Sequence, residues 1–235
     1  MIGQDLVARI DTARALLAEA ANDYGPAVLA SSMGAEDMVL IDLISRDRLP
    51  IGTFMLDTGR LHAETLELVD RARARYRVGI EVYRPDPAVL DRYIAANGAD
   101  AIFTSIDLRK ECCHIRKVEP LTRALAGKGS WITGLRRSQS VTRAGIPEKS
   151  WDTDHNLYKF SPLAAWSRDD VWEYIHDRKV PTNPLHDMGF VSIGCAPCTR
   201  AIQPGEDERA GRWWWEQPEH RECGLHPGYF ERGNP

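Results

Sequence analysis

Five cysteines are the residues of this 235-residue chain whose types and spacing could do the most specific chemistry. Four of them form two pairs, with Cys112 beside Cys113 and with two residues between Cys195 and Cys198. Four thiolates could hold a closed zinc site or an iron–sulfur cluster. Adjacent cysteines favour the cluster, because a four-iron cube offers each of them a separate iron, whereas sharing one zinc ion would strain the backbone. Zinc remains the alternative.

The fifth cysteine, Cys223, stands alone near the end of the sequence, in the run Glu-Cys-Gly-Leu-His that finishes at His226. A lone cysteine beside a glycine and a charged residue is expected to be exposed, and an exposed thiol with a histidine close by suits nucleophilic chemistry. A chemically silent surface thiol is the other interpretation.

Alternating strand and helix patterns must position these residues. An amphipathic helix is predicted over residues 6–20, and apolar strands at 27–30, 51–56 and 80–83 alternate with helical segments. This order predicts an α/β fold with a doubly wound, mostly parallel sheet. In such sheets the ligand binds beyond the carboxyl ends of the strands, where the strand order changes.

Two polar turns follow the first two strands and would lie at that edge. The first offers backbone N–H groups and hydroxyls to an anion, through Ser31, Ser32, Gly34 and Asp37. The second contains Asp57, Thr58 and Gly59. Asp57 is expected either to cap the following helix or to contact a ribose hydroxyl.

A basic loop follows a further predicted strand at residues 131–133. It contains Arg136, Arg137 and Arg143 together with Gln139 and several hydroxyls. Arginine binds phosphate and sulfate through paired donors, so this loop predicts an anion clamp, with a solvated basic loop as the alternative.

The first cysteine pair is predicted to lie near the start of a helix, where the helix dipole favours thiolates. Lys117 would then follow one turn later, facing both the thiolates and the substrate or else only solvent. Further on, Ser167 and Asp170 predict a capping box for a helix that reaches Lys179.

The composition changes after Cys198, with few aliphatic runs and many charges. This predicts one α/β domain over residues 1–202 and an irregular tail over residues 203–235. The tail contains Arg209 and Arg212, and its tryptophans at 213–215 are expected to anchor it to the domain.

The overall charge gives no reason to expect a nucleic acid or an anionic membrane as partner, since 30 Lys and Arg residues face 34 Asp and Glu residues. The sequence shows no secretory pattern and no apolar stretch of about 18 residues. A cytoplasmic protein is therefore expected, and its oligomeric state, including a homo-oligomer, stays open.

Four motifs in order resemble the phosphoadenylyl-sulfate and adenylyl-sulfate reductase family. They are residues 31–37, 56–60, 134–140 and 222–226. The resemblance implies an adenine nucleotide α-hydrolase-like fold, with the turns around Ser31 and Asp57 holding the nucleotide. Within the family, the two cysteine pairs are typical of the adenylyl-sulfate branch, which implies that Cys112, Cys113, Cys195 and Cys198 ligate a [4Fe-4S] cluster.

The resemblance also implies a reaction. Cys223 would attack the sulfur of adenosine 5'-phosphosulfate, AMP would leave, and thioredoxin would release sulfite from the resulting Cys-S-sulfonate. Lys117, the arginine loop, Arg209 and Arg212 would neutralise the substrate's charge, and His226 would orient or activate the thiol.

Three other functions remain open from the sequence. The substrate could carry a 3'-phosphate, or both nucleotides could be accepted. The chain could be a non-catalytic zinc or iron–sulfur binding module. An ATP-using sulfur-transfer enzyme of similar fold is disfavoured, because residues 31–37 depart from the SGGxDS loop that such an enzyme would need.

Overall fold

The computed structural model describes residues 2–140, 143–217 and 225 of the chain. A six-stranded sheet forms its centre, with the strand order β3-β2-β1-β4-β6-β5. The edge strand β5 pairs antiparallel with β6, and the other four pairings are parallel. The doubly wound, mostly parallel sheet expected from the sequence is therefore present.

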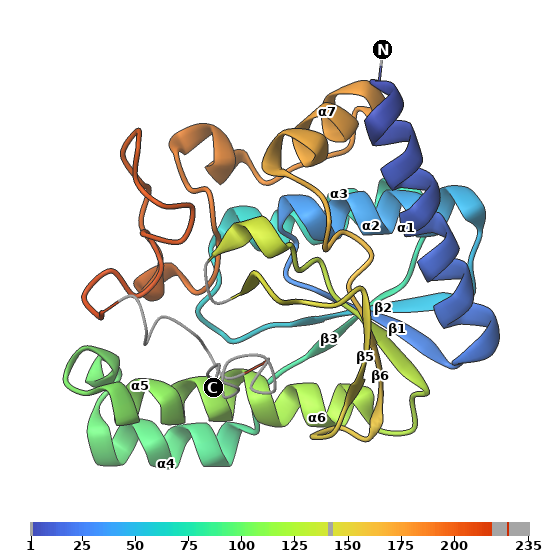
Figure 1. The fold of residues 1–235 in the computed structure, drawn as a ribbon. Coiled ribbons are helices and arrows are strands. Elements are labelled where there is room, and N and C mark those ends of the chain that lie inside the picture. The colour runs from blue at the N-terminus through green and yellow to red at the C-terminus, as the bar shows by residue number, and fades with distance from the viewer. Residues whose placement is uncertain (1, 141–142, 218–224, 226–235) are drawn as a thin grey trace.

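The first part of the chain builds one half of the sheet and one covering layer. Its elements are α1 (Gln4–Asp23), β1 (Ala27–Ser31), α2 (Ala35–Asp47), β2 (Ile51–Leu56), α3 (Ala63–Tyr76) and β3 (Ile80–Tyr83). Their helices lie on the same side of the sheet as α7 (Figure 1). The core on that side includes Leu17, Met38 and Leu68, all of which are fully buried.

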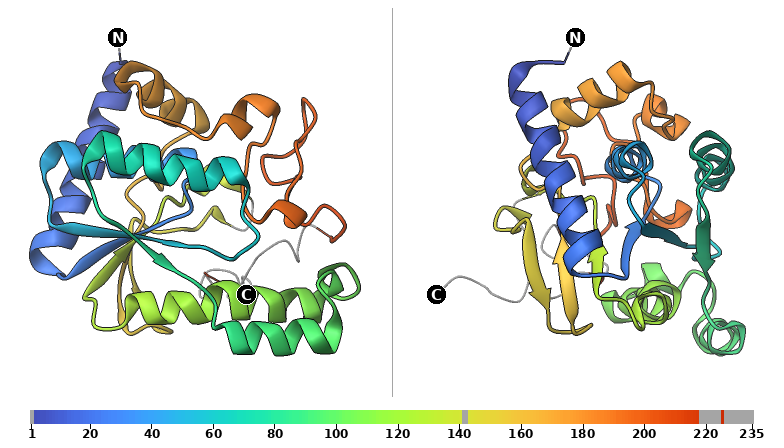
Figure 2. Two further views of the ribbon diagram at one scale, coloured as in Figure 1. Left: turned by 180° about the vertical axis from the view of Figure 1, so that it is seen from behind. Right: turned by 90° about the vertical axis from the view of Figure 1, so that its right-hand side faces the viewer.

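The middle of the chain forms the layer on the opposite side of the sheet (Figures 1 and 2). It comprises α4 (Pro87–Asn97), a 3-10 turn (Ala101–Phe103), α5 (Ile106–Cys113), a π-helical turn (His114–Val118) and α6 (Glu119–Leu125). A core containing Phe54, Leu121 and Trp131 joins this layer to the sheet.

The rest of the chain completes the other half of the sheet. It contains β4 (Ser130–Ile132), β5 (Lys149–Asp152), β6 (Leu157–Phe160) and α7 (Arg168–Arg178), with short 3-10 turns at Arg137–Gln139, Pro184–Met188 and Ala196–Cys198. The predicted capping box of α7 is confirmed, because Ser167 Oγ accepts from the Asp170 N–H and the Asp170 carboxylate accepts from the Ser167 N–H. The hairpin of β5 and β6 was not predicted.

The strand order changes direction at β1, which pairs with β2 on one side and β4 on the other. Connections therefore leave the carboxyl ends of these two strands in opposite directions, which opens a crevice for a ligand. Among the described residues, the structure contains no helix with the length and apolar character needed to cross a bilayer.

Candidate functional site

A pocket lies at the carboxyl ends of β1 and β4, and we call it the main pocket. The predicted substrate-binding and catalytic residues that line it are Ser31, Ser32, Gly34, Asp37, Thr58, Lys117, Gln139, Arg143, Arg209 and Arg212. These residues come from three predicted motifs, from the π-helical turn after α5 and from the tail. The topology thus collects at one edge of the sheet residues that are spread over most of the sequence.

The turn after β1 is held in shape by a carboxylate. Asp37 Oδ2 accepts hydrogen bonds from the backbone N–H of Ser32 at 2.6 Å and from Ser32 Oγ at 2.7 Å. Met33, between them, takes a positive φ of 61°. Gly34 precedes α2 and makes no side-chain cap, so the start of this helix presents its backbone amides to the main pocket.

The pKa values of two neighbouring carboxylates in this turn shift in opposite directions. Burial raises the pKa of Asp37 from 3.8 to about 6, and the negative charge of Glu36 adds to this rise although the Ser32 hydrogen bonds oppose it. Burial would also raise the pKa of Glu36, but Arg136 more than offsets it and lowers that pKa overall. The turn therefore contains one carboxylate with a paired cation and one whose charge is disfavoured.

Gly134, at the end of β4, brings the arginine loop against this turn. A side chain at position 134 would collide with the carboxylate of Asp37 and with the side chain of Glu36. Glycine is therefore required at this contact between the two loops.

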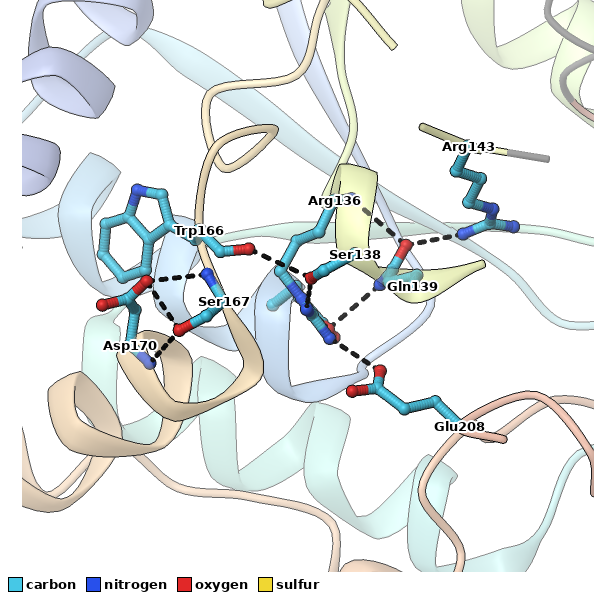
Figure 3. A network of polar contacts seen from close by, with 9 residues as sticks. Arg136, Ser138, Gln139, Arg143, Trp166, Ser167, Asp170 and Glu208 are labelled. Carbon is cyan, nitrogen blue, oxygen red and sulfur yellow. Dashed lines mark hydrogen bonds and ion pairs between the residues drawn. The ribbon is translucent and has the colours of Figure 1, made fainter. Parts of the chain in front are cut away.

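Arg136 stabilises the arginine loop through its buried guanidinium. Figure 3 shows its guanidinium reaching Ser138 and Glu208, with Nη1 donating to Ser138 Oγ at 2.6 Å and Nη2 to Glu208 at 3.0 Å. Its Nε donates to Glu36 at 2.8 Å, and only 2% of its side chain is exposed. These contacts make Arg136 a bridge between the two loops and the tail.

The other members of the loop differ in position. Gln139 donates to Glu36 at 3.0 Å and accepts from Arg143 Nη1 at 2.6 Å, and both residues line the main pocket. Arg137 instead donates to the Ile146 carbonyl at 2.8 Å and is partly exposed. The loop therefore presents Arg143, rather than all three arginines, to the pocket.

The turn after β2 corrects one prediction. Asp57 does not cap α3, because that helix begins at Ala63, six residues later, and its N-cap is His62. Its carboxylate accepts instead from the Gly59 N–H and from Arg84 Nε, each at 3.0 Å. The next residue, Thr58, lines the main pocket and places its hydroxyl 3.2 Å from the sulfur of Cys195.

Cations from distant segments also line the main pocket. Arg212 is buried, donates through Nη1 to the Ile193 carbonyl at 3.1 Å, and lines the pocket with Lys117 and Arg209. The buried Nε of Arg212 has no hydrogen-bond partner among the described residues, so a ligand oxygen could accept from it. A side chain at Gly194 would collide with the Arg212 guanidinium.

The two cysteine pairs line a smaller cavity, which we call the cysteine cavity. Its lining includes Cys112, Cys113, Cys195 and Cys198 together with the cations Arg60, Arg109, Arg116 and Lys117. All four of these thiols are buried and free of disulfides. Lys117 and Cys195 line both this cavity and the main pocket, so the two spaces share one wall.

The helix start predicted for the first pair is wrong. Cys112 and Cys113 end α5, and the chain continues through the π-helical turn into α6. The helix dipole therefore gives these thiols no support at this position. Arg116 lines the same cavity, places Nη1 2.6 Å from the Thr58 carbonyl, and has a buried Nε that lacks a hydrogen-bond partner in the described part of the chain.

The thiols of the second pair differ in acidity. Burial would raise the pKa of Cys195, yet Lys117, the Thr58 hydroxyl and two arginines lower it overall. Burial raises the pKa of Cys198 to about 12, and the neighbouring Cys195 adds to the rise. The second pair therefore contains one thiol whose charge is favoured and one whose charge is disfavoured.

The described residues contain no group of three or more His, Cys, Asp or Glu side chains arranged to hold a metal ion. What they contain is four buried thiols around a shared, cation-lined cavity. Such a donor set fits a group that bonds each thiolate at a separate corner better than a single ion bonded by all four.

The predicted nucleophile Cys223 and its neighbour His226 lie outside the described residues. Leu225, between them in the sequence, is described. It lines the main pocket and packs on the core that contains Phe54 and Trp131. Leu225 thus brings a described residue from the last part of the sequence to the main pocket.

The family is decided by a comparison with known protein families. The model of the phosphoadenosine phosphosulfate reductase domain matches residues 26–201. The chain belongs to the phosphoadenosine phosphosulfate reductase family. The reductase family predicted from the four sequence motifs is thereby confirmed.

Curated members of this reductase family extend the match over most of the chain. A protein from Burkholderia cepacia named adenosine 5'-phosphosulfate reductase is 53% identical, over 94% of this chain and 89% of its own length. A protein of the same name from Allochromatium vinosum is 52% identical, over 94% of this chain and 86% of its own.

Solved structures agree on the fold. The phosphoadenylyl-sulfate reductase of Candida auris, in a phosphate complex, superposes with a TM-score of 0.69 at 24% identity, covering 86% of this chain and 98% of that one. The NH3-dependent NAD synthetase of Campylobacter jejuni gives a TM-score of 0.55 at 14% identity, covering 75% of each chain. The predicted α-hydrolase-like fold is confirmed by these neighbours.

Several residues that shape the site of this family member escaped the sequence reasoning. Glu36 and Glu208 bind Arg136, Gly194 makes room for Arg212, and Arg109 binds Glu216. No local signal could have found the last pair, because its members lie 107 residues apart. Glu36 had a visible hint in the sequence, because it lies inside the motif at residues 31–37.

Proposed function

We propose that this chain reduces adenosine 5'-phosphosulfate to sulfite and AMP, with thioredoxin as the electron donor. The observation that carries the proposal is an identity of 53% and 52%, over 94% of the chain, to relatives named adenosine 5'-phosphosulfate reductase. The main pocket supports it, because its position and its cations suit an anionic nucleotide.

The two sides of the main pocket suit the two ends of this substrate. Ser31, Ser32 and the start of α2 offer hydroxyl and backbone donors on the side of the sheet where nucleotides bind in this fold class. Lys117, Arg209 and Arg212 also line the main pocket and would neutralise the sulfate end of the substrate. A thiolate attacking an anionic sulfonate needs such neutralisation in the transition state.

In the proposed reaction the Cys223 thiolate attacks the sulfur of the substrate. A sulfur–sulfur bond forms, the bond from that sulfur to the bridging oxygen breaks, and AMP leaves with the electron pair. His226 would orient or activate the thiol. Leu225, two residues after Cys223, lines the main pocket, which supports this assignment.

Reduction of the resulting Cys-S-sulfonate takes two electrons from a dithiol. One thiolate of thioredoxin attacks the Cys223 sulfur and releases sulfite, and the second thiol closes the thioredoxin disulfide and frees Cys223. The four buried free thiols suit a reducing compartment, so we place the protein in the cytoplasm.

Cys112, Cys113, Cys195 and Cys198 would hold a [4Fe-4S] cluster in the cysteine cavity. When bound, the cluster would supply fixed charge and rigidity beside the pocket rather than electrons, since the dithiol provides both electrons. Lys117 would join the two spaces, because it lines both. The division into a domain of residues 1–202 and a tail of residues 203–235 belongs to the same proposal.

Mass spectrometry of anaerobically purified protein tests the nucleophile. Incubation with adenosine 5'-phosphosulfate, without a reductant, is expected to add one sulfonate to Cys223. The Cys223→Ser variant is expected to form no adduct while keeping its iron and sulfide content. An adduct that persists in this variant would end the assignment of Cys223.

The substrate branch needs its own measurement. We expect kcat/KM for adenosine 5'-phosphosulfate to exceed that for the 3'-phosphorylated nucleotide. Equal values would show a dual-specificity enzyme. Zinc without sulfide in the purified protein would argue against the cluster and weaken the branch assignment.

A further inference from the structure

Residues 211–216, which we call the wall segment, connect the main pocket with the buried cluster that contains the four paired cysteines. The segment follows the second cysteine pair closely: the Arg200 N–H donates to the Gly211 carbonyl at 3.0 Å, and the Trp213 N–H donates to the Cys198 carbonyl at 3.2 Å. Arg212 and Trp213 line the main pocket. The backbone therefore fixes the start of the segment to the loop that carries Cys198.

A buried ion pair fixes the end of the wall segment. Arg109 on α5 donates to Glu216 through Nε at 2.9 Å and through Nη2 at 2.7 Å. The exposed fractions of the two side chains are 0% and 4%. This two-point geometry sets the direction of both side chains, and it ties the segment to the helix that ends in Cys112 and Cys113.

Trp213 lies between these two anchors and is 1% exposed. Three cations surround its ring, at 5.0 Å for Arg109, 4.6 Å for Arg212 and 5.7 Å for Lys117. It also belongs to the cluster of buried residues that contains the four paired cysteines. A shift of Glu216 would therefore move the ring against which Arg212 and Lys117 rest.

We propose that Arg109 and Glu216 are positioning residues, which hold the wall segment so that Arg212 presents its guanidinium to the sulfate end of the substrate. Arg109 lines the cysteine cavity, whereas Arg212 lines the main pocket. The pair thus acts on the pocket through Trp213 and Arg212. This inference rests on the proposed function for the identity of the ligand.

The test measures binding of adenosine 5'-phosphosulfate to cluster-loaded protein in a Cys223→Ser background, by calorimetry. Glu216→Gln keeps the size of the side chain but removes its charge. We expect this change to raise Kd about tenfold or more, because Arg109 then loses its counter-charge and the segment shifts. In an Arg212→Ala background the same change is expected to alter Kd less than about twofold, because the effect passes through Arg212.

A second Arg–Glu pair provides the matched control. Arg123 binds Glu119 through Nε at 2.7 Å and Nη2 at 3.0 Å, in the same two-point geometry but with both side chains over 40% exposed. Glu119→Gln is expected to leave Kd unchanged.

A double variant separates positioning from a loss of stability. Arg109→Met with Glu216→Leu removes both charges, which buried sites tolerate better than the loss of one partner. We expect near wild-type thermal stability but a Kd that stays raised, and this variant replaces Glu216→Gln if the single change does not fold. Wild-type Kd in a folded variant, or an equal effect of Glu216→Gln with and without Arg212, would overturn the proposal. Failure of the unmodified background to bind the nucleotide would instead count against the proposed function.

Discussion

Two groups of cations flank the main pocket, and they differ in what neutralises them. On the side of the arginine loop, Arg136 is buried between Glu36 and Glu208. On the side of the cysteine cavity, Lys117 and Arg212 lie close to Cys195, whose pKa they lower. An arginine whose charge is already matched by carboxylates holds loops together, whereas cations beside a thiol and a pocket can act on a ligand. The position of a cation in a motif therefore does not reveal its role.

The largest expected effect comes from a substitution in the arginine loop. Arg136→Ala leaves the buried carboxylate of Glu36 without its cation, and we expect the free energy of unfolding to fall by about 3 kcal/mol. Urea unfolding measures this change. Arg137→Ala, in the same loop but half exposed, is the control and should cost less than about 0.5 kcal/mol. Equal effects would mean that Arg136 is not the bridge.

Asp37, which contacts the arginine loop, should make the free energy of unfolding depend on pH. Its folded pKa of about 6 lies above the ordinary 3.8, so the folded state keeps its proton longer than the unfolded state. Stability from this group is full below pH 4 and is lost as pH rises through 6, by up to about 3 kcal/mol. Asp37→Asn should remove this loss.

Unfolding of both proteins between pH 4 and pH 7 checks the Asp37 prediction. The difference between wild type and Asp37→Asn isolates this group from the other titrating side chains. Parallel curves for the two proteins would contradict it.

On the cysteine side, Lys117→Ala is expected to act on rate. The variant loses a cation that lines both cavities, and S-sulfonate formation in a single turnover should slow by roughly 100-fold. The absorbance of the proposed iron–sulfur cluster should stay intact. Unchanged single-turnover kinetics would remove Lys117 from the reaction.

The smallest expected effect tests the role of Arg212 beside the cysteine cavity. Gly194→Ala would push the Arg212 guanidinium away, and we expect nucleotide affinity to fall about tenfold with little change in folding. Gly145→Ala is the control, because a side chain there meets no atom within 4 Å among the described residues. Titration calorimetry with adenosine 5'-phosphosulfate, on both variants in a Cys223→Ser background, measures the difference.

Much of the fold followed from the sequence where apolar runs were continuous. The predicted strands at 51–56 and 80–83 match β2 and β3, and the capping box of α7 was found from Ser167 and Asp170. The hairpin of β5 and β6 was missed because its strands, such as Lys149–Asp152, mix charged and aromatic residues and lack an apolar run. The helix of Cys112 was misplaced because charges fill the turns before it.

The candidate site could be predicted as a set of motifs but not as a geometry. The turns at Ser31 and Thr58 were found because strand ends of a parallel sheet meet at one edge. The contacts that sort one arginine from another, such as Arg136 with Glu208, join residues far apart in the chain. Local patterns contain no information on these partners, so only the folded arrangement distinguishes them.

Cys195 lines both cavities, and its sulfur lies 3.2 Å from the Thr58 hydroxyl. A molecule that fills the main pocket therefore lies against Cys195. We expect such a molecule to limit the access of small oxidants to this thiol.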